Sequence, residues 1–242
     1  MPSPDGRRIV VAVANDAGDT DLYVVPLDGS GFTRVTSGDG YDDQPVWSPD
    51  GRRIAFRRFT QQAGAEVWVA DVETGNATNL TADQAGGGQF SPVWAPNGDR
   101  LAYSHAAGGV AHVWSMRADG SDKRAITGGD VFDDQASWSP DGTTIVFQRT
   151  ATGIFGDLYL VSANGGDERK LMPFVDLAFG QFAPAWSPDG RLIAFSSKHE
   201  DGIYQIYTVW PDGSKLARRT NGEMNKQSPG WIPREAVAGL RR

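Results

Sequence analysis

A tetrapeptide that returns at nearly equal intervals constrains the fold of this chain more than any other feature. Ser-Pro-Asp-Gly occurs four times, beginning at Ser3, Ser48, Ser139 and Ser187, and a variant occupies 95–98. A series of tryptophans keeps the same period, with spacings of 47, 44, 48 and 45 residues. The series consists of Trp47, Trp94, Trp138, Trp186 and Trp231. Such self-similarity predicts five copies of one structural unit.

Each copy predicts a short run of β-strands. Pro presets φ at the first corner of a tight turn, Asp or Asn bonds back to the turn backbone, and Gly supplies a positive φ. The motif therefore predicts a hairpin turn between the Trp strand and an apolar strand such as 53–56. A third strand with a central aromatic residue follows, as at 66–70, and then a polar fourth strand, as at 79–81. Four strands in about 45 residues are typical of a β-propeller blade.

The two ends of the chain predict how the blades close into a ring. The chain reaches Ser3 just after the place of a Trp strand, and 228–231 supply that strand. We expect the last strand to complete the sheet begun by 7–13, which removes two open edges. The expected fold is all-β, a single five-bladed propeller domain over 1–242 with four-stranded antiparallel blades, closed by the C-terminal strand. The repeats are 3–47, 48–94, 95–138, 139–186 and 187–231, with a tail at 232–242.

These motifs resemble the TolB-type, WD-like β-propeller repeat. The resemblance rests on the Trp-Ser-Pro-Asp-Gly turn at 47–51, the apolar strand after it, strands such as 158–160 and endings such as 79–81. It covers residues 3–231 and implies a scaffold that binds a protein partner in a periplasmic or other extracytoplasmic location. Members usually have six blades, so a fragment of a six-bladed propeller is the alternative. Such blades also occur in peptidases and in one lyase family, so a propeller domain of a larger hydrolase or lyase stays open.

Charge and composition exclude several classes of function. The formal net charge is −7 and the pI is about 4.9, so the chain repels phosphate backbones and nucleic-acid binding is not expected. The absence of cysteine removes disulfides, thiolate metal sites and cysteine nucleophiles. No apolar run reaches the length of a membrane span, so we expect no membrane insertion. A monomer is expected, with a protein partner, a cation or a small polar molecule as its ligand.

The segments that lead into the Trp strands are the candidate binding surface, because they would line one mouth of the channel. Two of them contain Asp-Asp-Gln, two contain Gly-Gln-Phe, and the fifth fits neither pattern. This alternation predicts a duplicated two-blade unit with one blade added. The candidate residues are Asp42, Asp43, Gln44, Gln89, Phe90, Asp133, Asp134, Gln135, Gln181, Phe182, Lys226 and Gln227.

Four carboxylates among them suggest a cation. Asp42, Asp43, Asp133 and Asp134 would repel one another at one channel mouth and would attract a cation, a basic side chain or water. One hypothesis is therefore a Ca²⁺ or Mg²⁺ ion held by these residues, with Lys226 as an internal counter-charge. The alternative is that each Asp caps a turn and faces solvent. No other cofactor is expected.

No residue is assigned a catalytic role. His105 and His112 offer two imidazoles without an obvious third ligand, so we expect them on the surface, as we do His199. The chain contains no Gly-x-Ser-x-Gly elbow, phosphate loop or zinc-protease helix. Apolar side chains in two connections predict either a contact patch or local packing, and they are Phe155, Phe174, Leu177 and Phe179. The favoured function is a non-catalytic protein-interaction scaffold, and the alternative is a propeller that binds a cation or small ligand.

Overall fold

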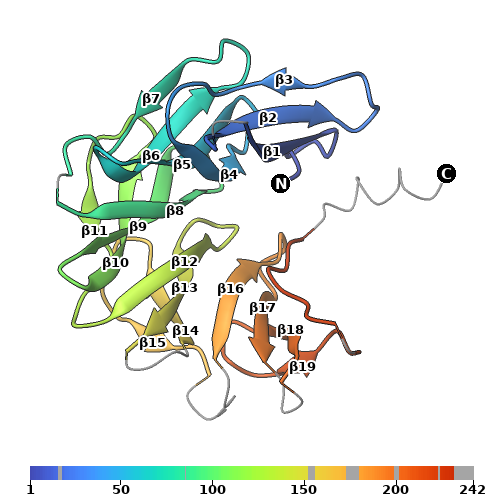
Figure 1. The fold of residues 1–242 in the computed structure, drawn as a ribbon. Coiled ribbons are helices and arrows are strands. Elements are labelled where there is room, and N and C mark those ends of the chain that lie inside the picture. The colour runs from blue at the N-terminus through green and yellow to red at the C-terminus, as the bar shows by residue number, and fades with distance from the viewer. Residues whose placement is uncertain are drawn as a thin grey trace. The chain divides into compact units, whose positions relative to one another are not determined.

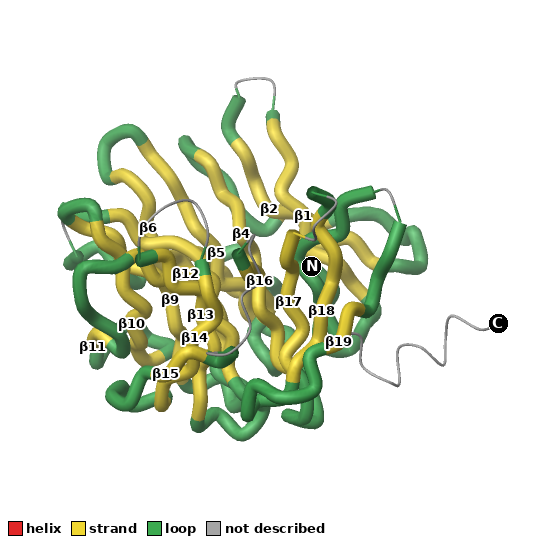
Figure 2. The backbone as a smooth tube through the Cα atoms, turned by 90° about the horizontal axis from the view of Figure 1, so that it is seen from below, coloured by secondary structure: helices red, strands yellow, loops and turns green. Residues whose placement is uncertain are grey.

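The described part of the chain consists of strands and loops. The computed structural model describes residues 1–15, 18–84, 86–151, 156–172, 180–198, 202–222 and 224–231. Figure 2 shows that every element in these ranges is a strand, a loop or a turn. A helix long and apolar enough to cross a membrane is not found among them. The predicted all-β class is therefore confirmed.

The strands follow the repeat along the chain (Figure 1). They are β1 (Arg8–Ala14), β2 (Thr20–Pro26), β3 (Thr33–Arg34), β4 (Tyr41–Trp47), β5 (Arg53–Thr60), β6 (Gly64–Asp71), β7 (Ala77–Asn79), β8 (Gly88–Trp94), β9 (Arg100–Ala107), β10 (Val110–Arg117), β11 (Arg124–Ala125), β12 (Phe132–Trp138), β13 (Thr144–Thr150), β14 (Asp157–Ser162), β15 (Arg169–Lys170), β16 (Gln181–Trp186), β17 (Ile193–Lys198), β18 (Tyr204–Val209) and β19 (Ala217–Arg218). We call β1–β3 group 1, β4–β7 group 2, β8–β11 group 3, β12–β15 group 4 and β16–β19 group 5.

The chain divides into two compact units. Unit 1 contains Met1–Gly109 and Ser115–Arg124, and unit 2 contains Val110–Trp114 and Ala125–Trp231. Groups 1 and 2 and strands β8 and β9 belong to unit 1, groups 4 and 5 belong to unit 2, and β10 and β11 are divided between the units. The expectation of one domain over the whole chain stays a prediction.

Unit 1 is built from antiparallel hairpins. Strand β1 pairs with β2 along its whole length, and β3 pairs with the far edge of β2. Strands β4, β5, β6 and β7 pair in sequence order, as do β8 and β9. Groups 1 and 2 meet at a parallel bridge between Thr20 and Tyr41. Their shared core includes Leu22, Ile54 and Phe56, all without exposed surface.

Unit 2 repeats this arrangement. Strands β12 to β15 form one antiparallel meander, and β16 to β19 form the next. The face of group 4 that carries Val146 and Leu158 packs against Ile193 and Phe195 of group 5. One group therefore covers the apolar face of the group before it, as the repeat predicts.

The Ser-Pro-Asp-Gly turns have the predicted form. In the copy at 48–51, the Gly51 N–H donates to the Ser48 carbonyl (2.9 Å) and Gly51 adopts a φ of 69°. The Ser48 hydroxyl donates to the Asp50 carboxylate (2.5 Å) and accepts the Arg53 N–H (2.9 Å). The same Ser–Asp hydrogen bond closes the turns that begin at Ser3, Ser139 and Ser187.

The indoles of Trp94 and Trp231 tie their segments to the Trp strand before them. The indole N–H of Trp94 donates to the Val46 carbonyl of β4 (3.3 Å), and that of Trp231 donates to the Ala185 carbonyl of β16 (3.0 Å). In group 2, the guanidinium of Arg53 lies over the Trp94 ring (4.6 Å) and bonds the Gly98 carbonyl of the next turn (3.3 Å). The repeated Trp is therefore a packing residue, as predicted.

Strands β4, β8, β12 and β16 each contain a bulge that the sequence did not predict, and the segment before Trp231 shares its backbone geometry. One residue in each adopts a left-handed backbone with φ between 50° and 55°. The five residues are Gln44, Ser91, Gln135, Ala183 and Ser228. The pairing of β4, β8, β12 and β16 with the next strand shifts register at this point. This conformation is strained for residues other than Gly, so the surrounding pairing must hold it in place.

Residues 1–3 contact the free edge of β1. Pro2, which precedes Ser3 as Trp47 precedes Ser48, forms a β-bridge with Ile9. The Val10 N–H also donates to the Met1 carbonyl (2.8 Å). The prediction that 228–231 complete the sheet begun by 7–13 joins residues of unit 2 to residues of unit 1, and it stays a prediction. The number of blades stays a prediction.

Threonine hydroxyls fix the fourth strand of most groups. The Oγ1 atoms of Thr36, Thr81, Thr127 and Thr220 accept the backbone N–H of Leu22, Val67, Val113 and Ile206 at 2.9–3.0 Å. Because Val67 is fully buried, loss of this acceptor leaves its N–H without a partner.

We expect Thr81→Val, which keeps the side-chain shape, to lower the free energy of unfolding by about 1–3 kcal/mol, since a buried donor is orphaned. Urea unfolding followed by circular dichroism measures the change. Thr78→Val, on an exposed position of the same strand β7, is the control and should change little. Equal effects of the two substitutions would contradict this role of the hydroxyl.

The turns also make stability depend on pH. The Ser hydrogen bond is the main cause that lowers the pKa of Asp5, Asp50, Asp141 and Asp189 below the ordinary 3.8. A depressed folded pKa gives stability that is complete above 3.8 and is lost as the pH falls further.

The free energy of unfolding should therefore fall between pH 5 and pH 3, and it should fall less in a variant with all four Asp replaced by Asn. Asn97 stands naturally in this position of the third turn, so the substitution suits the turn. Chemical unfolding of both proteins across this range measures the difference. Parallel pH profiles would rule out a contribution from these carboxylates.

Candidate functional site

In four Trp strands, the residue five positions before the Trp is buried rather than turned to solvent. Asp42, Gln89, Asp133 and Gln181 are each at most 1% exposed. Strands β4, β8, β12 and β16 carry them, and each lies opposite a residue of the following strand: Arg58, His105, Arg149 and Ser197. The residue across the hairpin therefore determines whether the buried side chain forms an ion pair or neutral hydrogen bonds.

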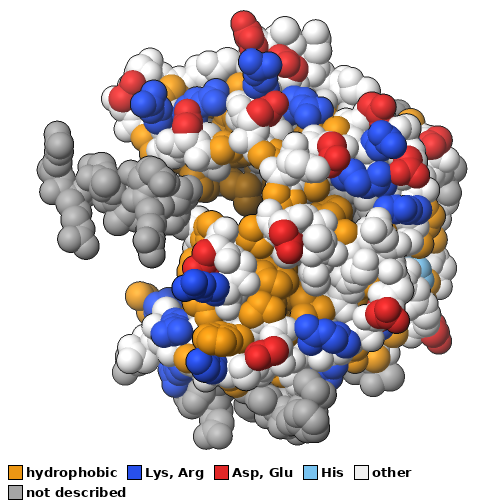
Figure 3. Space-filling view, turned by 180° about the vertical axis from the view of Figure 1, so that it is seen from behind, with side chains coloured by type: hydrophobic (Ala, Val, Ile, Leu, Met, Phe, Trp, Pro, Cys, Tyr) orange, Lys and Arg blue, Asp and Glu red, His pale blue; other side chains and the backbone are white. Residues whose placement is uncertain are grey.

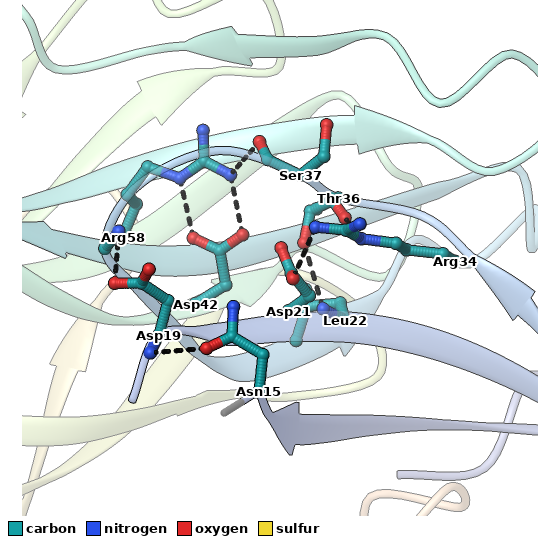
Figure 4. Close-up of polar contacts among 10 residues, drawn as sticks. Asn15, Asp19, Asp21, Leu22, Arg34, Thr36, Ser37, Asp42 and Arg58 are labelled. Atoms are coloured by element: carbon teal, nitrogen blue, oxygen red, sulfur yellow. Dashed lines mark hydrogen bonds and ion pairs between the residues drawn. The ribbon is translucent and has the colours of Figure 1, made fainter. Parts of the chain in front are cut away.

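Asp42 forms a buried ion pair with Arg58 (Figure 4). Both contacts, Nε to Oδ1 and Nη2 to Oδ2, are 2.6 Å. The guanidinium lies 4.7 Å above the Trp68 ring and also donates to the Ser37 carbonyl (3.3 Å). The hydrogen bond with Asp42 raises the pKa of Arg58 above its ordinary value, so this arginine stays charged. The charge of Asp42 is thus neutralised inside the chain.

Unit 2 contains the same pair. Arg149 binds the fully buried Asp133 at 2.7 and 2.8 Å and lies 5.0 Å from the Tyr159 ring. Arg149 also forms an ion pair with Glu168, and these bonds, chiefly the one to Asp133, raise its pKa. The Nδ1 atom of His112 lies 4.0 Å from the Asp133 carboxylate. The cluster contains two acids and one arginine, so it differs from the one-to-one Asp42–Arg58 pair.

The neighbouring carboxylates also have partners in the chain. Asp43 is half-buried and binds Arg57 through both oxygens, at 2.7 and 2.5 Å. Asp134 accepts the Gln135 N–H at 2.5 Å. Arginines of the facing strands supply the predicted counter-charge. The Lys226 ammonium instead donates to the Met224 carbonyl (3.0 Å). A metal site on the four Asp residues stays a prediction.

The two buried glutamines have structural partners. Gln89 contacts His105 Nδ1 (2.9 Å) and donates to the Gln84 carbonyl (3.2 Å). Gln181 accepts the Leu158 N–H (3.2 Å), the donor that a Thr hydroxyl binds in other groups. Met172 stands at that position in group 4 and has no hydroxyl, so Gln181 replaces it.

Gln44 and Gln135 connect successive inner strands. The Gln44 side chain accepts the Ser91 N–H (2.7 Å), and that of Gln135 accepts the Ala183 N–H (2.5 Å). Both acceptors and both donors are the left-handed residues of their bulges. The contact recurs in units 1 and 2 but in alternate groups, which supports the predicted duplication of a two-blade unit.

The remaining predicted residues lie at or near the surface. Phe90 is half-buried, and Phe182 packs edge-on against Tyr204 with ring centroids 5.0 Å apart. The Lys226 N–H bonds the Tyr204 carbonyl (2.8 Å), and Gln227 is exposed.

The structure shows no grouped metal ligands among the described residues and does not describe the apolar candidates. Within the described ranges, no three His, Asp or Glu side chains are grouped so as to hold a metal ion. His199 and the apolar candidates Phe155, Phe174, Leu177 and Phe179 lie outside the described residues.

Sequence reasoning missed Arg58 and Arg149, the partners of the buried carboxylates. A signal was present, since each Arg follows its Asp by 16 residues. The copies with Gln at this position have His105 and Ser197 instead. Finding the pairs required the hairpin register, which the unpredicted bulge changes.

The sequence matches a known family model, the TolB beta propeller domain, over residues 2–176. The chain belongs to the TolB beta-propeller family. The resemblance inferred from the Trp and Ser-Pro-Asp-Gly motifs is confirmed.

Three relatives show how far the likeness extends. An uncharacterized protein of Agrobacterium fabrum is 27% identical over 80% of this chain and 67% of its own length. A TolB homolog of Chlorobium luteolum is 30% identical over 86% of the chain and 47% of its length. Dipeptidyl-peptidase 5 of Porphyromonas gingivalis is 26% identical over 83% of the chain and 37% of its length. The chain thus spans less than half of the last two proteins.

Solved structures support the same fold. A putative TolB from Agrobacterium tumefaciens has a TM-score of 0.74 at 23% identity, covering 90% of this chain and 78% of its own. A puromycin-hydrolyzing peptidase of Mycobacterium tuberculosis has a TM-score of 0.70 at 15% identity, covering 90% and 37%. At these identities the likeness concerns the fold alone, because this fold carries many functions.

The buried pair yields a prediction about stability. Asp42→Leu should lower the free energy of unfolding by about 3–5 kcal/mol, because it leaves the Arg58 charge buried and unpaired. The double variant Asp42→Leu/Arg58→Met should recover most of this loss, since both charges are then removed. Denaturant unfolding of the single and double variants measures the coupling. Additive losses would show that the two side chains do not act as a pair.

Proposed function

We propose that this chain is a non-catalytic protein-interaction module. It is a TolB-type propeller that binds a protein partner at the ends of its inner strands and works as a monomer outside the cytoplasm. The ring of five four-stranded blades belongs to this proposal. The carrying observation is an exposed aromatic pair beside the predicted site. Tyr41 is 48% exposed and Phe59 is 39% exposed, with ring centroids 6.3 Å apart.

The aromatic pair lies on a rigid support. Tyr41 and Phe59 are register partners at the ends of β4 and β5, next to the pair Asp42 and Arg58. Gly40, with φ of 117°, brings the chain close to this edge, since a Cβ there would lie 2.5 Å from the Phe59 carbonyl. Aromatic rings held in this way lose little entropy on binding, and Tyr is common among the residues that dominate protein interfaces.

The charges nearby favour recognition over catalysis. Asp43 and Arg57 extend the aromatic pair with an ion pair that is about one-third exposed. Asp42 and Asp133 are bound bidentately by arginine, so neither is placed to exchange a proton with a substrate. On the face seen in Figure 3, acidic and basic side chains are interspersed, which supports recognition by local contacts.

A second candidate is the propeller domain of a larger peptidase. It is favoured by the relatives, because the chain spans 37% of dipeptidyl-peptidase 5 and 37% of the puromycin-hydrolyzing peptidase. In that case the propeller is attached to a catalytic domain, and the isolated chain should not cleave dipeptidyl nitroanilides. Cleavage by the purified chain would contradict both candidates.

The interaction proposal predicts position-specific cross-linking. A photoreactive benzoylphenylalanine at Tyr41 should form a discrete adduct with a protein of a bacterial envelope extract. The same residue at Glu73, in an exposed turn of group 2, is the control and should not. Phe59→Ala should weaken capture by about tenfold, as expected for one dominant interface residue. Identical adducts from positions 41 and 73 would count against this surface.

A further inference from the structure

Group 5 of unit 2 differs from the other groups at one repeated pair of positions. In every group, the residue directly after the last strand (here the fourth-strand residue) donates its backbone N–H to the carbonyl of a residue in the strand before it (the third-strand residue). The pairs are Val35 to Leu22, Leu80 to Val67, Ile126 to Val113, Leu171 to Leu158 and Arg219 to Ile206. This bond identifies equivalent residues without reference to sequence similarity, and Arg219 stands where the others carry an aliphatic side chain.

Burial differs in the same way. The third-strand residues Leu22, Val67, Val113 and Leu158 have no exposed surface, whereas Ile206 is partly exposed. The four aliphatic fourth-strand residues are at most 6% exposed, whereas Arg219 is exposed. In group 4 the equivalent face is covered by Ile193 and Phe195. The face of group 5 therefore lies open within unit 2.

An apolar pocket of about 420 Å³ occupies this face. It is lined mainly by Leu192, Ala194, Ile206, Thr208, Arg219 and Trp231. Trp231 is fixed by its bond to the Ala185 carbonyl (3.0 Å), and the Arg219 Nε donates to the Thr208 hydroxyl (2.7 Å). The walls are thus held in place, and the volume suits a few side chains.

The charge at the rim decides what can cover the pocket. An apolar surface like those in the other groups would bury the Arg219 guanidinium with only the Thr208 hydroxyl beside it and no carboxylate, which is costly. A carboxylate placed beside Arg219 removes this cost and gains a charge-assisted hydrogen bond.

We propose that this pocket binds an extended segment of a partner protein that inserts an apolar side chain and places an Asp or Glu carboxylate against Arg219. The site shares no residue with the aromatic pair of unit 1, so this proposal and the proposed function are tested independently.

The first test asks whether the face is open in solution. Because the chain has no cysteine, Ile206→Cys gives a single thiol at the pocket, and Val67→Cys gives one at the equivalent buried position. Ellman's reagent should modify position 206 at least about tenfold faster than position 67, where reaction requires local opening. Equal protection of both thiols would show that another part of the chain covers the pocket and would overturn the proposal.

The second test identifies the ligand chemistry. A random peptide library displayed on phage is selected on the full chain and counter-selected on Ile206→Asp, after circular dichroism shows that the variant is folded. Enriched peptides should pair an apolar residue with a nearby Asp or Glu. Fluorescence anisotropy of their synthetic forms should show about tenfold weaker binding to Arg219→Glu.

Arg218→Glu is the matched control, since it reverses a neighbouring charge that does not line the pocket, and it should change binding much less. Three results would overturn the proposal: no enrichment over the Ile206→Asp variant, enriched peptides that lack an acidic residue, or equal effects of Arg218→Glu and Arg219→Glu.

Discussion

A four-stranded β-sheet cannot bury its apolar faces alone, and the rest of this structure depends on that constraint. Val146 and Leu158 lose their exposed surface because group 5 packs Ile193 and Phe195 against them. Each large aliphatic or aromatic side chain buried in this way contributes about 1.5–3 kcal/mol. The Ser-Asp turns, the threonine hydroxyls and the indole bonds each hold strands in the register that this packing needs. Stability is thus shared between neighbouring groups.

Charged pairs inside such a junction need a different explanation from the apolar core. Burying Asp42 with Arg58 costs desolvation that their attraction only partly returns, so the pair is weak evidence for stability. The pattern of these pairs along the chain is more informative. Asp–Arg pairs at Asp42 and Asp133 alternate with glutamines, Gln89 and Gln181, at the same position of the next group. A group with the wrong partner across the hairpin would leave a charge unpaired. We infer that these positions help to fix register, a role known for other buried polar groups.

The local elements could be predicted from the sequence because each is encoded by adjacent residues. Pro, Asp and Gly specify the turns, and the alternation of Asp-Asp-Gln with Gly-Gln-Phe marks the two-group unit that the contacts of Gln44 and Gln135 repeat. The partners of the carboxylates could not be predicted, since they depend on hairpin register. The bridge between Pro2 and Ile9 could not be predicted either. Pro2 stands where the other copies have Trp, and a proline gives no signal of strand pairing. The contrast of Arg219 with Leu171 was visible in the sequence, but its meaning required the burial of its equivalents.

The left-handed residue in each Trp strand also determines which side chains of that strand point to the same face. In a regular strand, residues five positions apart, such as Asp42 and Trp47, point to opposite faces. Here both are buried, because the bulge at Gln44 adds one residue and reverses the alternation between them. One strand can therefore bury a charge at one end and an indole at the other. Deleting a single bulge residue would turn one of these side chains outward, so length in this segment is more constrained than residue type.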